Sequence, residues 1–132
     1  METALRESAK GEGRLRVTAR LVRLGNDCLV TITGGDRPHA GAVAVSLPRP
    51  SLTGDGTSAS TSVICLPGHK EDLLAREAGE RVARRLGVTA VVVAGIHLEG
   101  ATAEEIERLQ VLALEAVEAL LANATDTVTG GA

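Results

Sequence analysis

The chain has 132 residues, of which 44% are hydrophobic and 23% charged, values typical of one folded domain with a single core. Its net charge of −3 and its complete lack of Phe, Tyr and Trp exclude a nucleic-acid-binding protein, because phosphates require a basic surface and unpaired bases stack on aromatic rings. No apolar stretch approaches the roughly 18 residues that span a membrane, and the charged start METALRESAKGEG is unlike a signal peptide. We therefore expect a cytoplasmic protein without membrane contact.

One domain is predicted over residues 14–122, between two polar ends. Residues 1–13 and 123–132 are rich in small and polar side chains, so both ends are expected to be flexible tails. Cys28 and Cys65 lie far apart in apolar stretches, without the spacing of a metal-binding or redox pair. Both are expected to be buried structural thiols.

The first half of the domain has the pattern of four strands. Apolar and polar residues alternate from Arg14, and the turn signal GND at 25–27 joins this strand to the next one in a hairpin. We expect Pro48 and Pro50 to end the third strand, because proline cannot donate a backbone hydrogen bond. The four strands are predicted at 14–21, 28–33, 40–47 and 58–66.

The second half alternates helices with one strand. A helical period begins at Glu71 and ends before Gly87, which suits a left-handed helix end. The nearly continuous apolar run 88–96 is typical of a strand that is covered on both faces. A second helix begins at a capping box of Thr102 and Glu105 and is expected to reach about residue 121.

The predicted order β-β-β-β-α-β-α gives an α+β protein. It is a single-domain two-layer sandwich with a mostly antiparallel sheet and two helices packed on one face. Apolar residues surround more of the second helix than one sheet face needs, so this helix is expected to form a subunit interface in a homodimer.

Three histidines occur in loops beside glycine or proline. His39 follows GGDRP, His69 follows LPG and His97 follows VAGI, each at the edge of a predicted element. Helix N-termini bind anions through unpaired N–H groups, and imidazoles can ligate metals, with Asp36 and Glu99 as additional oxygen ligands. The pattern indicates either a shared ligand or metal site or three separate surface residues.

Other polar residues leave two interpretations open. Arg37 can bind a phosphate or carboxylate through paired hydrogen bonds, or it can serve only the turn before Pro38. The hydroxyls of residues 57–62 belong either to a solvated strand or to a polar pocket beside Arg49. Because the sequence contains no GxSxG nucleophile motif and no nucleotide-binding glycine fingerprint, it is more consistent with a binding protein than with an enzyme.

Three stretches, VTITGGDRPHAGAVAVSLPRPS, TSVICLPGHKEDLLAREAGERVARRLG and VVVAGIHLEGATAEEIE, together resemble the small LpdD-like proteins associated with UbiD-type aromatic-acid decarboxylases. The resemblance covers roughly residues 24–115. It implies a non-catalytic chaperone that binds prenylated FMN (or FMN) and delivers it to a UbiD-type decarboxylase, with flavin prenyltransferase as a second partner. The loops around His39, His69 and His97 would form the cofactor site.

The candidate cofactor-binding residues are Gly34, Gly35, Asp36, Arg37, His39, Arg49, Ser60, Ser62, His69 and His97, and His39, His69 and His97 are also the candidate ligands of a divalent metal. Two alternatives remain at this point. One is a small metal-dependent enzyme in which the three histidines hold a water molecule and Glu99 or Asp36 is the general base. The other is a structural subunit that stabilises a decarboxylase through its second helix.

Overall fold

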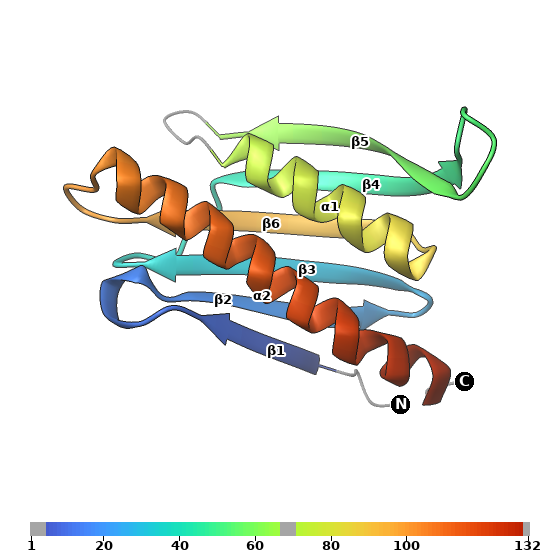
Figure 1. Ribbon diagram of the computed structural model, residues 1–132, viewed down its shortest axis with the longest axis horizontal. Helices are drawn as coiled ribbons and strands as arrows, with labels where there is room; N and C mark the ends of the chain where they lie inside the picture. Colours follow the sequence, from blue (N-terminus) through green and yellow to red (C-terminus); the bar gives the residue numbers. More distant parts are fainter. Residues whose placement is uncertain (1–4, 67–70, 131–132) are drawn as a thin grey trace.

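The computed structural model describes residues 5–66 and 71–130, with side chains described up to residue 122. Both helices lie against the same face of one six-stranded sheet (Figure 1). This confirms the predicted α+β class with a mostly antiparallel sheet. The elements are β1 (Leu5–Lys10), the short 3-10 helix η1 (Gly13–Leu15), β2 (Val17–Leu24), β3 (Asp27–Gly35), β4 (Ala42–Pro50), β5 (Thr57–Cys65), α1 (Asp72–Leu86), β6 (Ala90–His97) and α2 (Ala103–Gly130).

The strand order β1-β2-β3-β6-β4-β5 places β6 in the interior of the sheet. The β3–β6 pair is parallel, whereas all other neighbours are antiparallel. The last residues of β3 and β6, Gly35 and His97, therefore lie side by side. Because β6 lies between β3 and β4, residues 36–41 must cross the end of β6 to reach β4. This crossing is the feature that gathers the loops at one end of the sheet.

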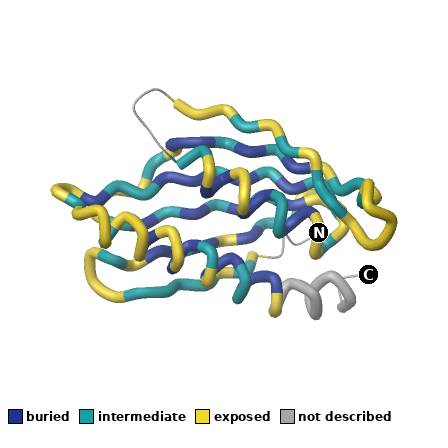
Figure 2. The backbone as a smooth tube through the Cα atoms, turned by 45° about the horizontal axis from the view of Figure 1, so that its top comes forward, coloured by how far each residue is buried: buried dark blue, intermediate teal, exposed yellow. Residues whose placement is uncertain are grey.

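Aliphatic side chains and alanines fill the space between the sheet and the helices. Along the strands buried and less buried residues alternate (Figure 2), as expected when one face meets the helices. Small residues let α1 approach closely: a Cβ on Gly79 would lie 2.5 Å from the Oγ of Ser46. Ser46 is fully buried and shares a 2.8 Å hydrogen bond with Thr61, so its hydroxyl is satisfied in the core.

The structure contains the predicted end of α1 and the predicted start of α2. Gly87 ends α1 with a φ of 66°, and its N–H donates to the carbonyl of Ala83. Before α2, the Glu105 N–H donates to the Thr102 hydroxyl and the Thr102 N–H donates to the Glu105 carboxylate, which completes the capping box. Within the described residues, no helix is long and apolar enough to cross a membrane.

The structure differs from expectation at both ends and in one strand. Residues 5–10, predicted to belong to a flexible tail, form the edge strand β1, and α2 continues to Gly130. Strand β4 extends through Pro48 and Pro50. These prolines are tolerated because β4 pairs with β6 only as far as Ser46, so beyond that point one side of β4 needs no donors.

The two cysteines have different environments. Cys28 is 1% exposed in the core, whereas Cys65 is exposed, so the expectation of two buried thiols was wrong for Cys65. Cys65 is the last residue of β5, an edge strand of the sheet. Desolvation by burial raises the pKa of the Cys28 thiol to about 11.

Strand β6 is not covered on both faces by the described chain. Its helix-facing residues Ala90, Val92 and Ala94 are fully buried, but Val91 and Val93 point to the opposite face and are only partly buried. Both helices lie on the other side (Figure 1). We call this opposite side the helix-free face; it consists of the side chains that share the pleat of Val22, Leu29, Val91 and Val45.

Candidate functional site

The crossing segment 36–41 passes over β6 on the helix-free face, and glycines make this possible. A Cβ on Gly95 would lie 1.6 Å from the carbonyl oxygen of His39, so no other residue fits beneath the segment. Gly35 has a φ of +73°, and a Cβ there would lie 2.1 Å from the carbonyl oxygen of His97. The Asp36 N–H donates to that same carbonyl at 2.6 Å. The loop is therefore held against the end of β6 by its backbone.

Gly34, the other glycine of the GGDRPH motif, has a different role. Its Cβ would lie 2.6 Å from the carbonyl oxygen of Arg16 and 3.0 Å from the Cα of Val17. The absence of a side chain at Gly34 thus allows the chain before β2 to pack against the end of β3. It opens no space for a ligand.

His39 points toward a carboxylate that precedes α1. Its Nε2 lies 3.2 Å from Oε1 of Glu71, and its Nδ1 lies 3.1 Å from the carbonyl oxygen of Arg37. Both oxygens can accept hydrogen bonds, so each ring nitrogen of His39 lies beside an acceptor. The side chains of His39 and Glu71 are only 21% and 12% exposed.

Glu71 ties the site to the sheet. Its Oε1 accepts the N–H of Ile96 at 3.3 Å, and a Cβ on Gly41 would lie 2.5 Å from its Oε2. Oε2 is buried and has no hydrogen-bond partner among residues 5–66 and 71–122. A buried carboxylate oxygen in this state can accept a hydrogen bond from a ligand that enters the site.

A second, exposed cluster surrounds Glu99. His97 Nε2 lies 3.0 Å from Oε2 of Glu99, and the Arg37 guanidinium lies 3.9 Å from the same oxygen. The Glu99 N–H donates to the Asp36 carboxylate at 2.9 Å, and Arg14 donates to the Glu99 carbonyl at 2.5 Å. The hydrogen bond and positive charge of His97 lower the pKa of the Glu99 carboxyl.

The two clusters are adjacent, because the His39 and His97 rings lie edge to face with centroids 6.4 Å apart. The end of the sheet therefore combines two imidazoles, one guanidinium that is 73% exposed, and the three carboxylates of Asp36, Glu71 and Glu99. This set offers donors to an anion and acceptors to a neutral polar group.

His69 lies outside the described residues. The described residues on either side of its segment both contact the site: the Leu66 N–H donates to the Gly41 carbonyl at 2.9 Å, and Glu71 contacts His39. Its inclusion with His39 and His97 stays a prediction.

The other predicted residues lie elsewhere. Arg49 is seven residues along β4 from Ala42, about 23 Å from the end that carries the histidines, and its Nε donates to Ser60 at 2.9 Å. Ser62 lies opposite Val45 on β5. The structure thus gathers Gly35, Asp36, Arg37, His39 and His97, whereas Arg49, Ser60 and Ser62 form a separate polar group on the helix-free face. Sequence alone does not say which end of a strand faces the site.

The described residues contain no group of three His, Cys, Asp or Glu side chains arranged to hold a metal ion. Both nitrogens of His39 face oxygen atoms, so this ring would have to leave Glu71 or Arg37 to ligate a metal. The metal prediction is left without support from the described part of the chain.

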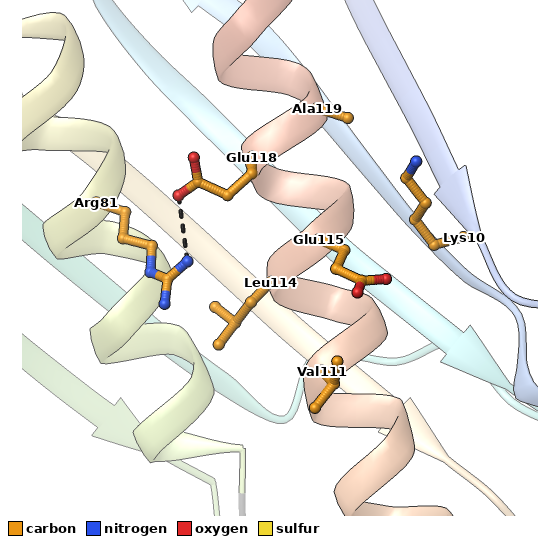
Figure 3. Close-up of a pocket in the computed structure, with 7 residues that line it drawn as sticks. All are labelled: Lys10, Arg81, Val111, Leu114, Glu115, Glu118 and Ala119. Atoms are coloured by element: carbon orange, nitrogen blue, oxygen red, sulfur yellow. Dashed lines mark hydrogen bonds and ion pairs between the residues drawn. The ribbon is translucent and has the colours of Figure 1, made fainter.

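A separate groove of about 760 Å³ lies between α1, α2 and β1 on the helical face (Figure 3). Its cation Arg81 is already paired with Glu118 at 3.1 Å and with Glu77 at 3.0 Å. The groove lies on the opposite face of the sheet from the crossing segment 36–41, and Lys10 is a second cation in its lining. Its lining residues are Lys10, Arg81, Val111, Leu114, Glu115, Glu118 and Ala119.

Comparison with known proteins decides the family. The model of the prenylated flavin chaperone LpdD-like domain matches residues 11–125. The chain belongs to this family. The LpdD-like match begins just before η1 and ends within α2, so it includes the loops of His39 and His97. No curated protein matches the sequence.

The LpdD-like chain also has the fold of a solved protein. It is similar to a chain in the crystal structure of a novel chaperone complex for yeast 20S proteasome assembly, with a TM-score of 0.50 and 11% identity over 98% of this chain and 95% of that one. At this identity the likeness concerns the fold alone.

Proposed function

We propose that this LpdD-like protein is a non-catalytic carrier, which accepts prenylated FMN from flavin prenyltransferase and delivers it to a UbiD-type decarboxylase. The family assignment supports a role with prenylated flavin. The observation that carries the choice of site is the meeting of Arg37, His39 and His97 at the end of β3 and β6. Loops at strand ends are common ligand sites in folds with helices on a sheet.

The residues at this end suit the chemistry of the cofactor. A flavin mononucleotide carries an anionic phosphate, which Arg37 can bind because its guanidinium is largely exposed and 3.9 Å from its carboxylate neighbour. Its ribityl hydroxyls and ring imide N–H are donors, for which the unsatisfied Oε2 of Glu71 is an acceptor. The chain has no aromatic residue, so the ring would lie on aliphatic side chains, peptide planes or a guanidinium.

In this proposal the protein holds the cofactor and performs no chemistry on it. When delivered to an enzyme, the prenylated flavin supplies the electron-accepting ring for decarboxylation. Arg37 and His97 neutralise the phosphate, and Glu71 fixes His39. The exposure of Arg37 and Glu99 keeps their interactions weak in water, which suits a protein that must release its ligand.

The alternatives have less support. A metal-dependent enzyme needs a metal site, and the described residues show none. A structural subunit that docks through α2 needs an apolar helix surface, yet most of that surface is buried in this chain, including Leu109, Leu112, Val117 and Leu120.

The first prediction tests the site through Arg37. Co-expression with a flavin prenyltransferase should give a coloured protein, whose visible spectrum is free of any contribution from the protein itself. Arg37→Ala should weaken cofactor binding by about tenfold or more, because a hydrogen-bonded charge contributes roughly 1.5–3 kcal/mol. Titration followed by visible absorbance measures the dissociation constant.

The matched control is Arg85→Ala, which removes an exposed ion pair with Glu118 on the helical face. It should leave binding unchanged. A wild-type protein that stays colourless and fails to activate an apo-decarboxylase would contradict the carrier function, whereas equal binding by Arg37→Ala would contradict only this location. Metal analysis of the loaded protein tests whether His39, His69 and His97 also hold a divalent ion.

A further inference from the structure

The helix-free face carries a continuous apolar row across five strands. The strand register places Leu5 beside Val22, Val22 beside Leu29, Leu29 beside Val91, and Val91 beside Val45. Side chains opposite one another in neighbouring strands share a face and are in contact range. An uninterrupted aliphatic band therefore crosses the sheet on the side without helices.

A second group of apolar side chains widens this band. Val93 and Val43 are neighbours in the next row, which ends at Ile64. Leu24, Leu47 and Ile64 lie on the same face at separate positions and are 50%, 51% and 67% exposed, high values for large aliphatic residues. Among the described elements, only the crossing segment 36–41 lies over this face, and it covers the end near Gly95.

The face is electrically balanced. Its charged residues are Glu7, Arg20, Asp27 and Arg49, two negative and two positive, by their register positions. Glu7 and Arg20 form an ion pair with each other at 2.5 Å. With no net charge on this face and a net charge of −3 on the whole chain, nothing attracts it to an anionic membrane or to a highly charged protein.

The dimensions of the face match an interface. Six strands about 4.8 Å apart and about eight residues long give a surface of about 24 by 26 Å, or about 600 Å² in projection. The relief of the side chains increases the accessible area toward the roughly 800 Å² that each partner buries in a standard interface.

We propose that a second copy of this chain packs against the helix-free face, so that two sheets lie face to face with the helices on the outside. The aliphatic face of one twisted sheet is complementary in shape to the same face of a second copy, and such sheets pack about 10 Å apart. The apolar run of β6, typical of a strand covered on both faces, is then fully covered. The proposal does not depend on which ligand the histidine loops bind.

The dimer is tested by sedimentation velocity on the full chain at micromolar concentration, with interference optics because the protein has no Tyr or Trp to absorb light. Wild type should sediment as a dimer. Leu47→Lys and Ile64→Lys should each raise the dimer dissociation constant by at least about 30-fold, because each would place an unpaired ammonium group in the apolar interface. Each of the two side chains is at least half exposed in the single chain. The substitutions should therefore leave the fold of the chain, and its far-UV circular dichroism, unchanged.

Control variants separate this face from others. Leu73→Lys on α1 replaces a leucine that is 71% exposed on the helical side and should leave the dimer intact. Val111→Lys on α2, where the sequence predicts the interface, should also leave it intact. Isotope-filtered NOEs in a mixed-label wild-type sample should connect the methyl groups of Val45 and Val91 between copies.

Three results would overturn the proposal. The first is a wild-type monomer at 100 μM, a concentration well above the dissociation constants of standard interfaces. The second is a dimer that dissociates on Val111→Lys but not on Leu47→Lys or Ile64→Lys. The third is intermolecular NOEs that come from the methyl groups of Ile106 and Val111 in place of those of the sheet.

Discussion

At the scale of single residues, Glu71 is the main addition that the structure makes to the site. In the sequence it stands at the start of a helix, where an acidic side chain is explained by the helix dipole. The structure turns this carboxylate toward His39 and the Ile96 N–H. The available signal was its position two residues after His69, but sequence spacing in a loop does not reveal which way a side chain points.

A second prediction concerns the stability that Glu71 provides. Glu71→Ala should lower the free energy of unfolding by about 2 kcal/mol, because it removes the acceptor of the part-buried Ile96 N–H and the carboxylate beside His39. Glu71→Gln keeps an oxygen at this position and should cost less. Urea unfolding followed by far-UV circular dichroism measures both, and Glu107→Ala at an exposed position of α2 is the control. Equal stabilities of the three variants would contradict the role of Glu71.

A third prediction follows from the Cys28 thiol, whose pKa burial raises from 9.0 to about 11. Between these values the unfolded chain loses the proton and the folded chain keeps it. The free energy of unfolding should therefore fall as the pH rises from 9 to 11, by at most about 1.4 kcal/mol per pH unit. Below pH 9 this thiol contributes no slope.

Urea unfolding at several pH values tests this dependence. Few other side chains titrate between pH 9 and 11, because the chain has no tyrosine and its only lysines are Lys10 and Lys70. Cys28→Ala should flatten the dependence, whereas Cys65→Ala, at the exposed cysteine, should not. If the free energy of unfolding of Cys28→Ala still falls between pH 9 and 11, another group causes the pH dependence.

At the scale of elements, much of the chain was predictable because local signals agree with the final fold. The capping box of Thr102 and Glu105 and the left-handed Gly87 are local features, and α2 begins and α1 ends where these residues indicate. Strand β1 was missed because an edge strand buries little: its helix-side residues are Arg6, Ser8 and Lys10. The partner that makes this polar segment a strand is β2, a contact that no local pattern encodes.

A fourth prediction concerns the crossing segment over β6. Gly95→Ala should lower the free energy of unfolding by about 3 kcal/mol or more, because the new Cβ overlaps the His39 carbonyl and must displace residues 36–41. Cofactor retention should fall with it. Gly25→Ala is the matched control, since it carries only the strain of a φ of +62° in open space and should cost about 1 kcal/mol. If both variants lost the same free energy of unfolding, residues 36–41 would be able to move away from β6 without strain.

At the scale of the whole molecule, the candidate site was predictable only in part. The loops of His39 and His97 meet because β3 and β6 run parallel and end together, which a search for strand ends anticipates. Arg49, Ser60 and Ser62 were included because strand hydroxyls beside Arg49 can line a polar pocket, yet β4 carries Arg49 toward the opposite end of the sheet. Most apolar side chains of α2 are buried within the chain, although Ile106 and Val111 are about half exposed. The sheet also exposes apolar residues, among them Leu47 and Ile64.

The interior position of β6 also determines when the site comes into existence. The β2–β3 and β4–β5 hairpins join segments that are neighbours in sequence, but the two hairpins cannot unite until residues 90–97 enter between them. Pairings of such long sequence separation form late in folding, because closing the chain costs entropy before the contacts form. The carbonyl of His97, which holds the crossing segment, arrives only with this step. A chain that has not completed its sheet therefore has no histidine cluster, and under the proposed function only fully folded molecules would bind the cofactor.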